Sequence, residues 1–241
     1  MIGSNLVKRL TRNGEHVMVV DNLWRGKREY LCDESGSFVI DMENQFFERD
    51  LSVPGALGDL ISDVEIVFHL ADIVGGIDFV FDNEGSVFRQ NLLINSNVIA
   101  SCRASNLRGF VYVGTACSFP AELQSGVDAA PLQEKDQYPA NPESAYGWSK
   151  LMGEYEAMLM EKETGIPVSV LSLHNVYGTP CEYGAKTSQV IPALIRKAVE
   201  YPAEPFVVWG SGTQGRAFVH VDDVVTALEH RAFNLQRILH L

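Results

Sequence analysis

Short apolar runs alternate with segments of helical periodicity over residues 1–171 of this chain. The runs are rich in β-branched and aromatic residues, and they lie at residues 17–20, 45–48, 65–70, 109–113 and 167–171. Between them, apolar residues recur at helical spacing over residues 4–13, 86–106 and 144–164. Mostly apolar strands suit a parallel sheet that is buried on both faces. The alternation therefore predicts an α/β fold with a doubly wound parallel sheet.

The pattern changes near residue 172, where glycine and proline interrupt it and further helices are expected at 188–200 and 222–233. We interpret residues 1–171 as a Rossmann-type dinucleotide-binding domain and residues 172–241 as a smaller, partial substrate-binding lobe. A dinucleotide-binding sheet begins with a strand and a glycine-rich turn, but here Met1–Leu6 runs directly into a helix. We expect the sheet to lack its first strand, Gly3 to be the last glycine of that turn, and both ends to be truncated.

The net charge of −12 argues against nucleic acid and anionic membranes as partners, because the chain offers them little basic surface. No apolar run approaches the ~18 residues that cross a bilayer, and the N-terminus has no signal-peptide pattern. The cysteines form no Cys-x-x-Cys pair and are too few for a disulfide scaffold: Cys32, Cys102, Cys117 and Cys181. These features predict a cytoplasmic protein with no nucleic-acid or membrane partner and no metal site.

The segment Ser144-Ala-Tyr-Gly-Trp-Ser-Lys150 places a tyrosine and a lysine four residues apart at the start of an expected helix. Positions i and i+4 share a helix face, so Tyr146 and Lys150 can point into one site. A phenol loses its proton near pH ~10, and a nearby cation lowers that pKa. The pair is therefore a candidate general acid/base. A core tyrosine and a solvated lysine on an ordinary amphipathic helix are the alternative explanation of this spacing alone.

In a nucleotide-binding βαβ unit, an acidic residue about 20 positions after the glycines accepts hydrogen bonds from the adenosine ribose. Asp21 stands 18 positions after Gly3, at the end of the strand expected at 17–20. Its charge repels a 2′-phosphate and so favours NAD over NADP, although Arg25 weakens this preference. A turn or helix-capping aspartate explains the position equally well. The residues expected around the cofactor are Gly3, Asp21, Asn22, Asp50, Leu51, Leu70, Ala71, Tyr146 and Lys150.

Several segments occur in the order and at the spacing of one known family: Ile2–Leu6, Asp21–Leu23, Phe68–Ala71, Tyr146–Lys150, Asn175–Gly178 and Arg216–Asp223. With them the chain resembles the extended short-chain dehydrogenase/reductases, the NAD-dependent epimerase/dehydratase family of nucleotide-sugar enzymes. The branches of GDP-mannose 3,5-epimerase and GDP-L-fucose synthase are the most similar. The resemblance implies an NAD-dependent isomerase or oxidoreductase that binds a nucleotide-diphosphate sugar. It also implies a homodimer formed through the helices near 86–106 and 143–164.

The segment Gly114-Thr-Ala-Cys-Ser-Phe-Pro120 is the most discriminating part of the resemblance. It implies that Thr115 hydrogen-bonds the sugar O4 and that Cys117 is an acid/base at the sugar ring. Without the resemblance, Cys117 reads as a small buried hydrophobe. Gln189 stands where both branches place a second acid/base, a histidine or lysine, and Lys186 one turn earlier is a candidate substitute if the loop bends. The residues expected at the substrate are Gly76, Asn175, Gln189, Trp209 and Arg216.

The resemblance implies a reaction through a transient 4-keto sugar, in which Tyr146 takes the 4-hydroxyl proton and Cys117 moves a ring proton. Arg216 is the candidate for the diphosphate, because a guanidinium fork matches phosphate oxygens. A surface salt bridge to Asp222 or Asp223 is the alternative role for that arginine. Two other functions stay open: a nucleotide-sugar 4-epimerase that does not use Cys117, and a non-catalytic NAD-binding fragment.

Overall fold

The computed structural model describes residues 1–124, 129–184, 188–208, 210, 212 and 215–233. All five strands expected from the sequence are present, and every strand pair is parallel. Two further strands, which the sequence did not predict, pair with each other across more than forty residues of chain. The strands are β1 (Val19–Asp21), β2 (Phe46–Glu48), β3 (Ile66–His69), β4 (Gly109–Thr115), β5 (Val168–Leu173), β6 (Asn175–Tyr177) and β7 (Phe218–His220).

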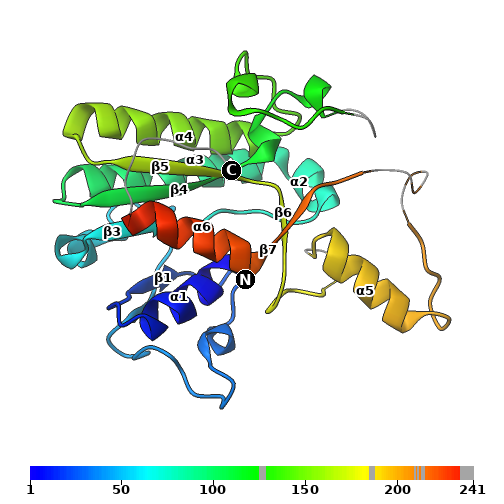
Figure 1. The fold of residues 1–241 in the computed structure, drawn as a ribbon, viewed down its shortest axis with the longest axis horizontal. Coiled ribbons are helices and arrows are strands. Elements are labelled where there is room, and N and C mark those ends of the chain that lie inside the picture. Colours follow the sequence, from blue (N-terminus) through cyan, green and yellow to red (C-terminus); the bar gives the residue numbers. More distant parts are fainter. Residues whose placement is uncertain (125–128, 185–187, 209, 211, 213–214, 234–241) are drawn as a thin grey trace.

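The helices follow the predicted periodicity, with one short addition, α2, before the long helix α3. They are α1 (Ile2–Arg12), α2 (Ile77–Asp82), α3 (Glu84–Arg103), α4 (Ala145–Thr164), α5 (Val190–Glu200) and α6 (Val221–Phe233). In Figure 1, α3 and α4 cover one face of the β3–β4–β5 sheet, and α6 and α1 lie on the other. Helices on both faces confirm the predicted doubly wound α/β fold.

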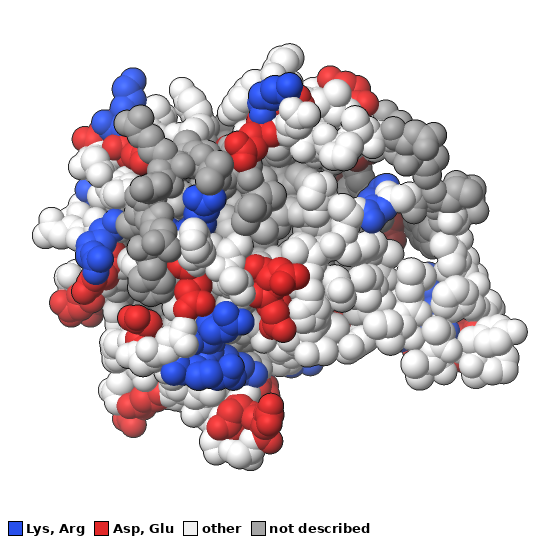
Figure 2. Space-filling model, viewed as in Figure 1, with Lys and Arg blue, Asp and Glu red and all other residues white. Residues whose placement is uncertain are grey.

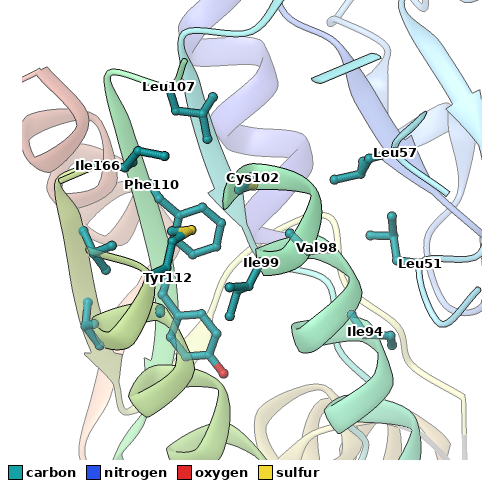
Figure 3. Close-up of a cluster of buried hydrophobic side chains, with 14 residues drawn as sticks. Leu51, Leu57, Ile94, Val98, Ile99, Cys102, Leu107, Phe110, Tyr112 and Ile166 are labelled. Carbon is teal, nitrogen blue, oxygen red and sulfur yellow. The ribbon is translucent and has the colours of Figure 1, made fainter. Parts of the chain in front are cut away.

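Alternate residues of the central strand β4 enter two different cores. Phe110 and Tyr112 point toward α3 and α4, where Ile99 and Met160 are fully buried (Figure 3). Val111 and Val113 point the other way, into the cluster with α1 and α6. Because successive side chains of a strand face opposite sides, this division accounts for the continuous apolar run at 109–113.

The parallel strands form separate ladders rather than one sheet. β1 pairs with β2, and β3 pairs with β4, but within the described ranges β1 and β3 are not hydrogen-bonded to each other. This break lies where the sequence predicts that the first strand is lacking. The C-terminal helix α6 packs on β4 and β5 and against α1, so part of the segment 172–241 belongs to the core of the sheet. The domain boundary at 171/172 stays a prediction.

Charged groups of both signs lie on the face that Figure 2 shows. The basic side chains there form small groups that are bordered by acidic ones. Within the described part of the chain, no helix has both the length and the apolar character needed to cross a membrane. The described residues also contain no cluster of three or more His, Cys, Asp or Glu side chains arranged to hold a metal ion.

Candidate active site

The first turn of α4 is capped by Ser144, and Gly147 lets this turn lie close to the segment that follows β4. Ser144 is the N-cap, and its hydroxyl oxygen accepts a hydrogen bond from the backbone N–H of Gly147 (3.2 Å). A Cβ added at Gly147 would overlap the carbonyl oxygen of Cys117. The glycine therefore lets the first turn of α4 approach the Thr115–Cys117 segment closely, and this brings Tyr146 to that segment.

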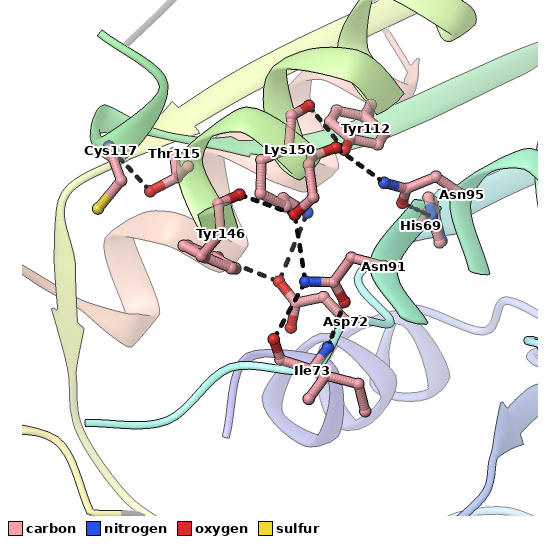
Figure 4. A network of polar contacts seen from close by, with 11 residues as sticks. His69, Asp72, Ile73, Asn91, Asn95, Tyr112, Thr115, Cys117, Tyr146 and Lys150 are labelled. Atoms are coloured by element: carbon pink, nitrogen blue, oxygen red, sulfur yellow. Dashed lines mark hydrogen bonds and ion pairs between the residues drawn. The ribbon is translucent and has the colours of Figure 1, made fainter. Parts of the chain in front are cut away.

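Tyr146 and Lys150 meet at one carboxylate, that of Asp72 (Figure 4). The Tyr146 hydroxyl donates to Asp72 Oδ2 at 3.1 Å, and Lys150 Nζ lies 3.5 Å from the same oxygen. Lys150 is only 1% exposed, and its Nζ lies 4.6 Å from the centre of the Tyr112 ring. A solvated lysine, the alternative explanation of the Tyr-x-x-x-Lys spacing, does not describe this side chain.

Burial and charge shift the pKa values of both groups. Burial, and then the Asp72 and Cys117 charges, hold the pKa of Tyr146 well above its ordinary value. Burial lowers the pKa of Lys150, although the carboxylates of Asp72 and Glu154 oppose this. The sequence predicted that a cation would lower the pKa of this phenol. The direction of the pKa shift is the opposite, because the phenol is buried and because the Asp72 carboxylate lies beside it.

Two asparagines on α3 fix the segment that carries Asp72. Asn91 accepts from the backbone N–H of Ile73 (2.6 Å), donates to the Ile73 carbonyl oxygen (3.1 Å) and reaches the Ser149 hydroxyl. Asn95 pairs with the ring Nε2 of His69 (2.8 Å) and donates to the carbonyl oxygen of Ser149. Burial lowers the pKa of His69 to about 4, so the ring is neutral at neutral pH. Both asparagines thus tie the end of β3 to α4.

Sequence reasoning missed the roles of Asp72, Asn91 and Asn95. The two asparagines lie one helical turn apart in a segment noted only for its resemblance to the family. Both are fully buried in the structure, where a polar group needs a hydrogen-bond partner. The signal available in the sequence was the pair of amides at positions i and i+4 of an expected helix. Asp72 offered only its place at the end of a strand, at the edge of a sheet where ligands collect.

Thr115 and Cys117 lie at the carboxyl end of β4, on the opposite side of the Tyr146 ring from Asp72 in the view of Figure 4. Thr115 is nearly buried, and its hydroxyl oxygen caps the following 3-10 turn by accepting from the backbone N–H of Cys117 (3.2 Å). The Cys117 thiol is exposed, so the small-buried-hydrophobe explanation does not hold for it. A cavity of about 500 Å³ opens beside this segment; its lining residues are Ala116, Phe119, Leu132, Gln133, Glu134, Lys135, Ser172 and His174.

Two of the residues expected around the cofactor, Asp21 and Asp50, lie at the carboxyl ends of β1 and β2. Asp21 is exposed at the end of β1, and one carboxylate oxygen accepts from the backbone N–H of Leu23 (2.7 Å). Asp50 follows β2, and one of its carboxylate oxygens accepts from the backbone N–H of Ser52 (2.9 Å). A Cβ added at Gly3, in the first turn of α1, would meet no protein atom within 4 Å. That open space at a helix N-terminus suits a phosphate group.

The other expected cofactor residues differ in how they are placed. The Asn22 side chain accepts from the backbone N–H of Trp24 (3.0 Å) and is exposed. Leu51 is buried in the core with α3, so its side chain serves packing. Leu70 and Ala71 are half-buried and pack against opposite cores, on either side of the strand end that leads to Asp72.

The expected substrate residues lie in the C-terminal part of the chain, except Gly76, which precedes α2. Asn175 begins β6 and donates to the carbonyl oxygen of Ala217 (3.1 Å), whereas Arg216 is exposed and donates to the carbonyl oxygen of Gly215. Gln189 is the N-cap residue of α5. Gly76 has a packing reason to be glycine, because an added Cβ would lie 2.9 Å from the Ser188 carbonyl oxygen. Trp209 and the substitute base Lys186 lie outside the described residues.

Comparison with known proteins assigns the family. A model of the NAD dependent epimerase/dehydratase family matches residues 1–237. The chain belongs to this family. The NAD dependence of the family confirms the predicted cofactor. The matched relatives are enzymes, as expected.

Two relatives show where the chain stands within the family. GDP-mannose 3,5-epimerase of Arabidopsis thaliana is 30% identical over 224 residues, which are 93% of this chain and 57% of the relative. GDP-L-fucose synthase of Escherichia coli is 29% identical over 170 residues, or 69% of this chain and 52% of the relative. Both branches were predicted from the sequence. The chain therefore spans a little over half the length of these relatives.

A solved structure shows the same fold. UDP-N-acetylglucosamine 4-epimerase from Methanobrevibacter ruminantium M1, in complex with UDP-N-acetylmuramic acid, superposes with a TM-score of 0.83 at 22% identity. The superposition covers the whole of this chain and 73% of that one.

The expectation that Asp21 accepts hydrogen bonds from the ribose leads to a first prediction. Replacing Asp21 by asparagine keeps the acceptor for the Leu23 N–H but removes the charge. We expect the dissociation constant for NAD to rise by roughly tenfold or more, because a charge-assisted hydrogen bond contributes ~1.5–3 kcal/mol. The ratio of the dissociation constants for NADP and NAD should also become smaller in Asp21→Asn. Calorimetric titration with both nucleotides measures this, and Asp63→Asn, an exposed aspartate elsewhere, is the control. If the unchanged protein, Asp21→Asn and Asp63→Asn bound NAD with equal affinity, Asp21 would not be a cofactor-binding residue.

Proposed function

We propose that this chain is the NAD-dependent part of a nucleotide-sugar epimerase, or epimerase/reductase, that acts through a transient 4-keto sugar. The observation that carries the proposal is the meeting of Tyr146 and Lys150 at the carboxyl end of the sheet, beside Thr115 and an exposed Cys117. These are the groups needed for proton transfer at a sugar alcohol and at its neighbouring carbon. Membership in an NAD-dependent epimerase/dehydratase family supports the redox half of the reaction.

Each residue then has a defined task. Bound NAD would supply the acceptor and, later, the donor for the hydrogen on C4. Tyr146 would take the proton of the 4-hydroxyl as the ketone forms and return it as the alcohol reforms. Thr115 would hold the same oxygen, and Lys150 would bind the nicotinamide ribose. The 4-keto group makes the hydrogens on C3 and C5 acidic, and the Cys117 thiolate would remove one of them.

The substrate class is a nucleotide-diphosphate sugar. The relatives' names support a GDP- or UDP-linked sugar, since they include GDP-mannose 3,5-epimerase and a putative UDP-glucose 4-epimerase. Arg216 and Asn175 are the candidates for the diphosphate and the sugar, with Gly76, Gln189 and Trp209 around them. Arg216 is exposed, and among the described residues its guanidinium donates to the neighbouring carbonyl oxygen of Gly215. A guanidinium has further N–H donors, which suit phosphate oxygens.

A second candidate is a 4-epimerase or 4-keto reductase that never uses Cys117. The specific observation in its favour is Gln189, an amide at the position where the similar branches have a second acid/base. Relatives at 26% identity include dTDP-4-dehydro-6-deoxy-D-allose reductase of Streptomyces sp. A third candidate is a non-catalytic NAD-binding protein, which would bind NAD but turn over no sugar.

Location and assembly are also part of the proposal. All four cysteines are free thiols, which supports a reducing, cytoplasmic compartment. The outer surfaces of α3 and α4 expose Leu93, Met152 and Tyr155, and these apolar side chains support a homodimer through the two helices. The mixed charge on the face in Figure 2 supports the absence of a nucleic-acid partner.

Deuterium exchange tests the function and the role of Cys117 together. In deuterated water with NAD and a matching GDP- or UDP-sugar, we expect the protein to incorporate deuterium at C3 or C5. Cys117→Ala should lower that incorporation by about 10²-fold or more, because a positioned acid/base contributes ~10²–10⁴-fold. Oxidation at C4 should continue in this variant.

The control is Cys32→Ala, which removes a partly buried thiol in another part of the chain. Undiminished activity of Cys117→Ala would favour the second candidate, either as a C4-epimer formed with NAD or as a 4-keto nucleotide sugar reduced by added NADH. If no nucleotide sugar gave a deuterated, 4-keto or C4-inverted product with NAD, and no 4-keto sugar was reduced with NADH, the first two candidates would both fall.

A further inference from the structure

Gln137 is a buried glutamine at the end of the short 3-10 helix Glu134–Gln137, in the loop between β4 and α4. We propose that Gln137 is a positioning residue of this site: it holds the turn that carries Cys117 at a fixed place relative to α4 and Tyr146. The inference rests on the proposed function, because it concerns the cysteine that is proposed to move a ring proton. It assigns a role to a loop residue that the sequence did not predict.

The amide of Gln137 joins two different elements. Its Nε2 donates to Glu154 Oε2 on α4 at 3.0 Å and to Ser118 Oγ at 3.4 Å. A side-chain amide nitrogen carries two N–H donors, so both bonds can exist together. Gln137, Glu154 and Ser118 are 3%, 2% and 0% exposed, and buried polar groups of this kind need their partners. Gln137 therefore forms a bridge between α4 and the turn that follows β4.

Ser118 passes this restraint to Cys117, its neighbour in the short 3-10 turn after β4. The Ser118 hydroxyl donates to the carbonyl oxygen of Thr115 at 2.7 Å, and its oxygen accepts from Gln137. Gln124, which is exposed, donates to carbonyl oxygens at both ends of the same turn. The turn is therefore held by its buried serine and by an outer contact, and it presents the exposed Cys117 thiol.

Glu154 fixes the other end of the bridge to the helix of the candidate acid/base. Tyr146 and Glu154 both lie on α4, eight residues apart, so they are two turns from each other along one side of the helix. The Tyr146 hydroxyl and the first turn of α4 have supports of their own, which are Asp72 and the Ser144 cap. Loss of Gln137 would therefore release the turn after β4 while Tyr146 stays in place.

The 3-10 helix that ends in Gln137 also contributes to the cavity beside this turn. Residues 133–135, at its start, form part of the cavity wall together with Ala116 and Phe119. The bridge therefore fastens this wall and the Cys117 turn to the same helix, α4.

The consequence concerns one step of the proposed reaction. After C4 is oxidised, a proton on C3 or C5 passes to the Cys117 thiolate, and its electron pair becomes the enolate of the C4 ketone. The thiolate has to meet the same sugar that Tyr146 and Thr115 hold at O4, and a misplacement of about 1 Å can cost roughly 10²-fold in rate. Thr115 itself is held in the β4–β5 ladder, opposite Leu173. Gln137 should therefore affect proton transfer at C3 or C5 more than hydride transfer at C4.

The first readout is amide hydrogen exchange, followed by NMR in the protein without any sugar. Gln137→Met keeps an unbranched side chain of similar length and removes both N–H donors. The backbone N–H of Cys117 donates to Thr115 Oγ1 at 3.2 Å, and we expect it to exchange about tenfold or more faster in this variant. The N–H of Gly147, which donates to the Ser144 cap, should exchange at an unchanged rate.

Kinetics provide the second readout. With a reacting nucleotide sugar and NAD, deuterium incorporation at C3 or C5 should fall by about 10–100-fold in Gln137→Met. Reduction of NAD by the hydrogen on C4 should change far less, because Tyr146 and Thr115 keep their own supports. Gln45→Met is the matched control, since this glutamine precedes β2 and donates to the carbonyl oxygen of Val17 (2.8 Å), away from the site. It should leave both readouts unchanged.

Ser118→Ala is measured in parallel, because it cuts the same bridge at its other end and keeps the question answerable if Gln137→Met misfolds. An unchanged Cys117 amide in either folded variant would overturn the proposal. A faster amide with an unchanged ratio of ring-proton exchange to C4 oxidation would also overturn it, since Gln137 would then serve stability alone. The amide measurement needs no nucleotide sugar, so a faster Cys117 amide would support the bridge even if every tested sugar were inert.

Discussion

Tyr146→Phe should lower the turnover of a nucleotide sugar by about 10²–10⁴-fold, the range that a positioned acid/base contributes. The ring stays in place beneath the Thr115–Cys117 segment, and only the hydroxyl that donates to Asp72 is lost. Substrate and NAD affinity should change far less than kcat, because the phenol transfers a proton in the transition state. Steady-state kinetics and calorimetry separate the two effects.

The same helix supplies a matched control for this prediction. Tyr155 also lies on α4 but is 55% exposed, so Tyr155→Phe removes an identical hydroxyl away from the site. Its turnover should stay within about twofold of the unchanged protein, since surface substitutions are usually near neutral. A folded Tyr146→Phe variant that kept a tenth or more of the activity would exclude the phenol as the acid/base.

Gly147→Ala should destabilise the fold by about 1–3 kcal/mol, although alanine is the better helix former by ~1 kcal/mol. The added Cβ would overlap the carbonyl oxygen of Cys117, and it would also press on Pro142 at 2.9 Å. The N-terminal turn of α4 and the end of β4 would have to separate. Urea unfolding measures the loss, and the displacement of Cys117 from Tyr146 should lower turnover as well.

Gly85→Ala is the matched comparison, because Gly85 lies in the first turn of the other long helix, α3. A Cβ there would meet no atom within 4 Å, and neither glycine has a positive φ. This variant should therefore gain up to about 1 kcal/mol from helix propensity alone. Equal stability of the two alanine variants would show that α4 does not pack on Cys117 as described.

The core of the fold was predictable from local pattern. The run Gly109–Val113 is apolar at every position after the glycine, and β4 proves to be buried on both faces. The strands β6 and β7 were not predicted, because each has three residues and its partner lies some forty residues away. Such pairing depends on tertiary contacts, and neither Asn175–Tyr177 nor Phe218–His220 carries a periodic signal of its own.

In the candidate site, too, local spacing was predictable from the sequence and long-range contacts were not. The four-residue spacing predicted that Tyr146 and Lys150 share a face, and both reach the same carboxylate. The partner itself was beyond the sequence, since Asp72 is 74 residues from Tyr146 and its aim depends on the Asn91 link. Burial of the phenol, and then the charge of Asp72, raise the pKa of Tyr146, so the predicted direction of the shift was wrong.

Nicotinamide absorbance during a single turnover shows whether a 4-keto sugar forms. When the NAD-loaded protein is mixed with its nucleotide sugar, we expect a transient rise in reduced nicotinamide as C4 is oxidised. Tyr146→Phe should bind both ligands, as shown by calorimetry, and give a flat trace. A flat trace from the unchanged protein with both ligands bound, or an unaltered rise in Tyr146→Phe, would contradict the proposed reaction.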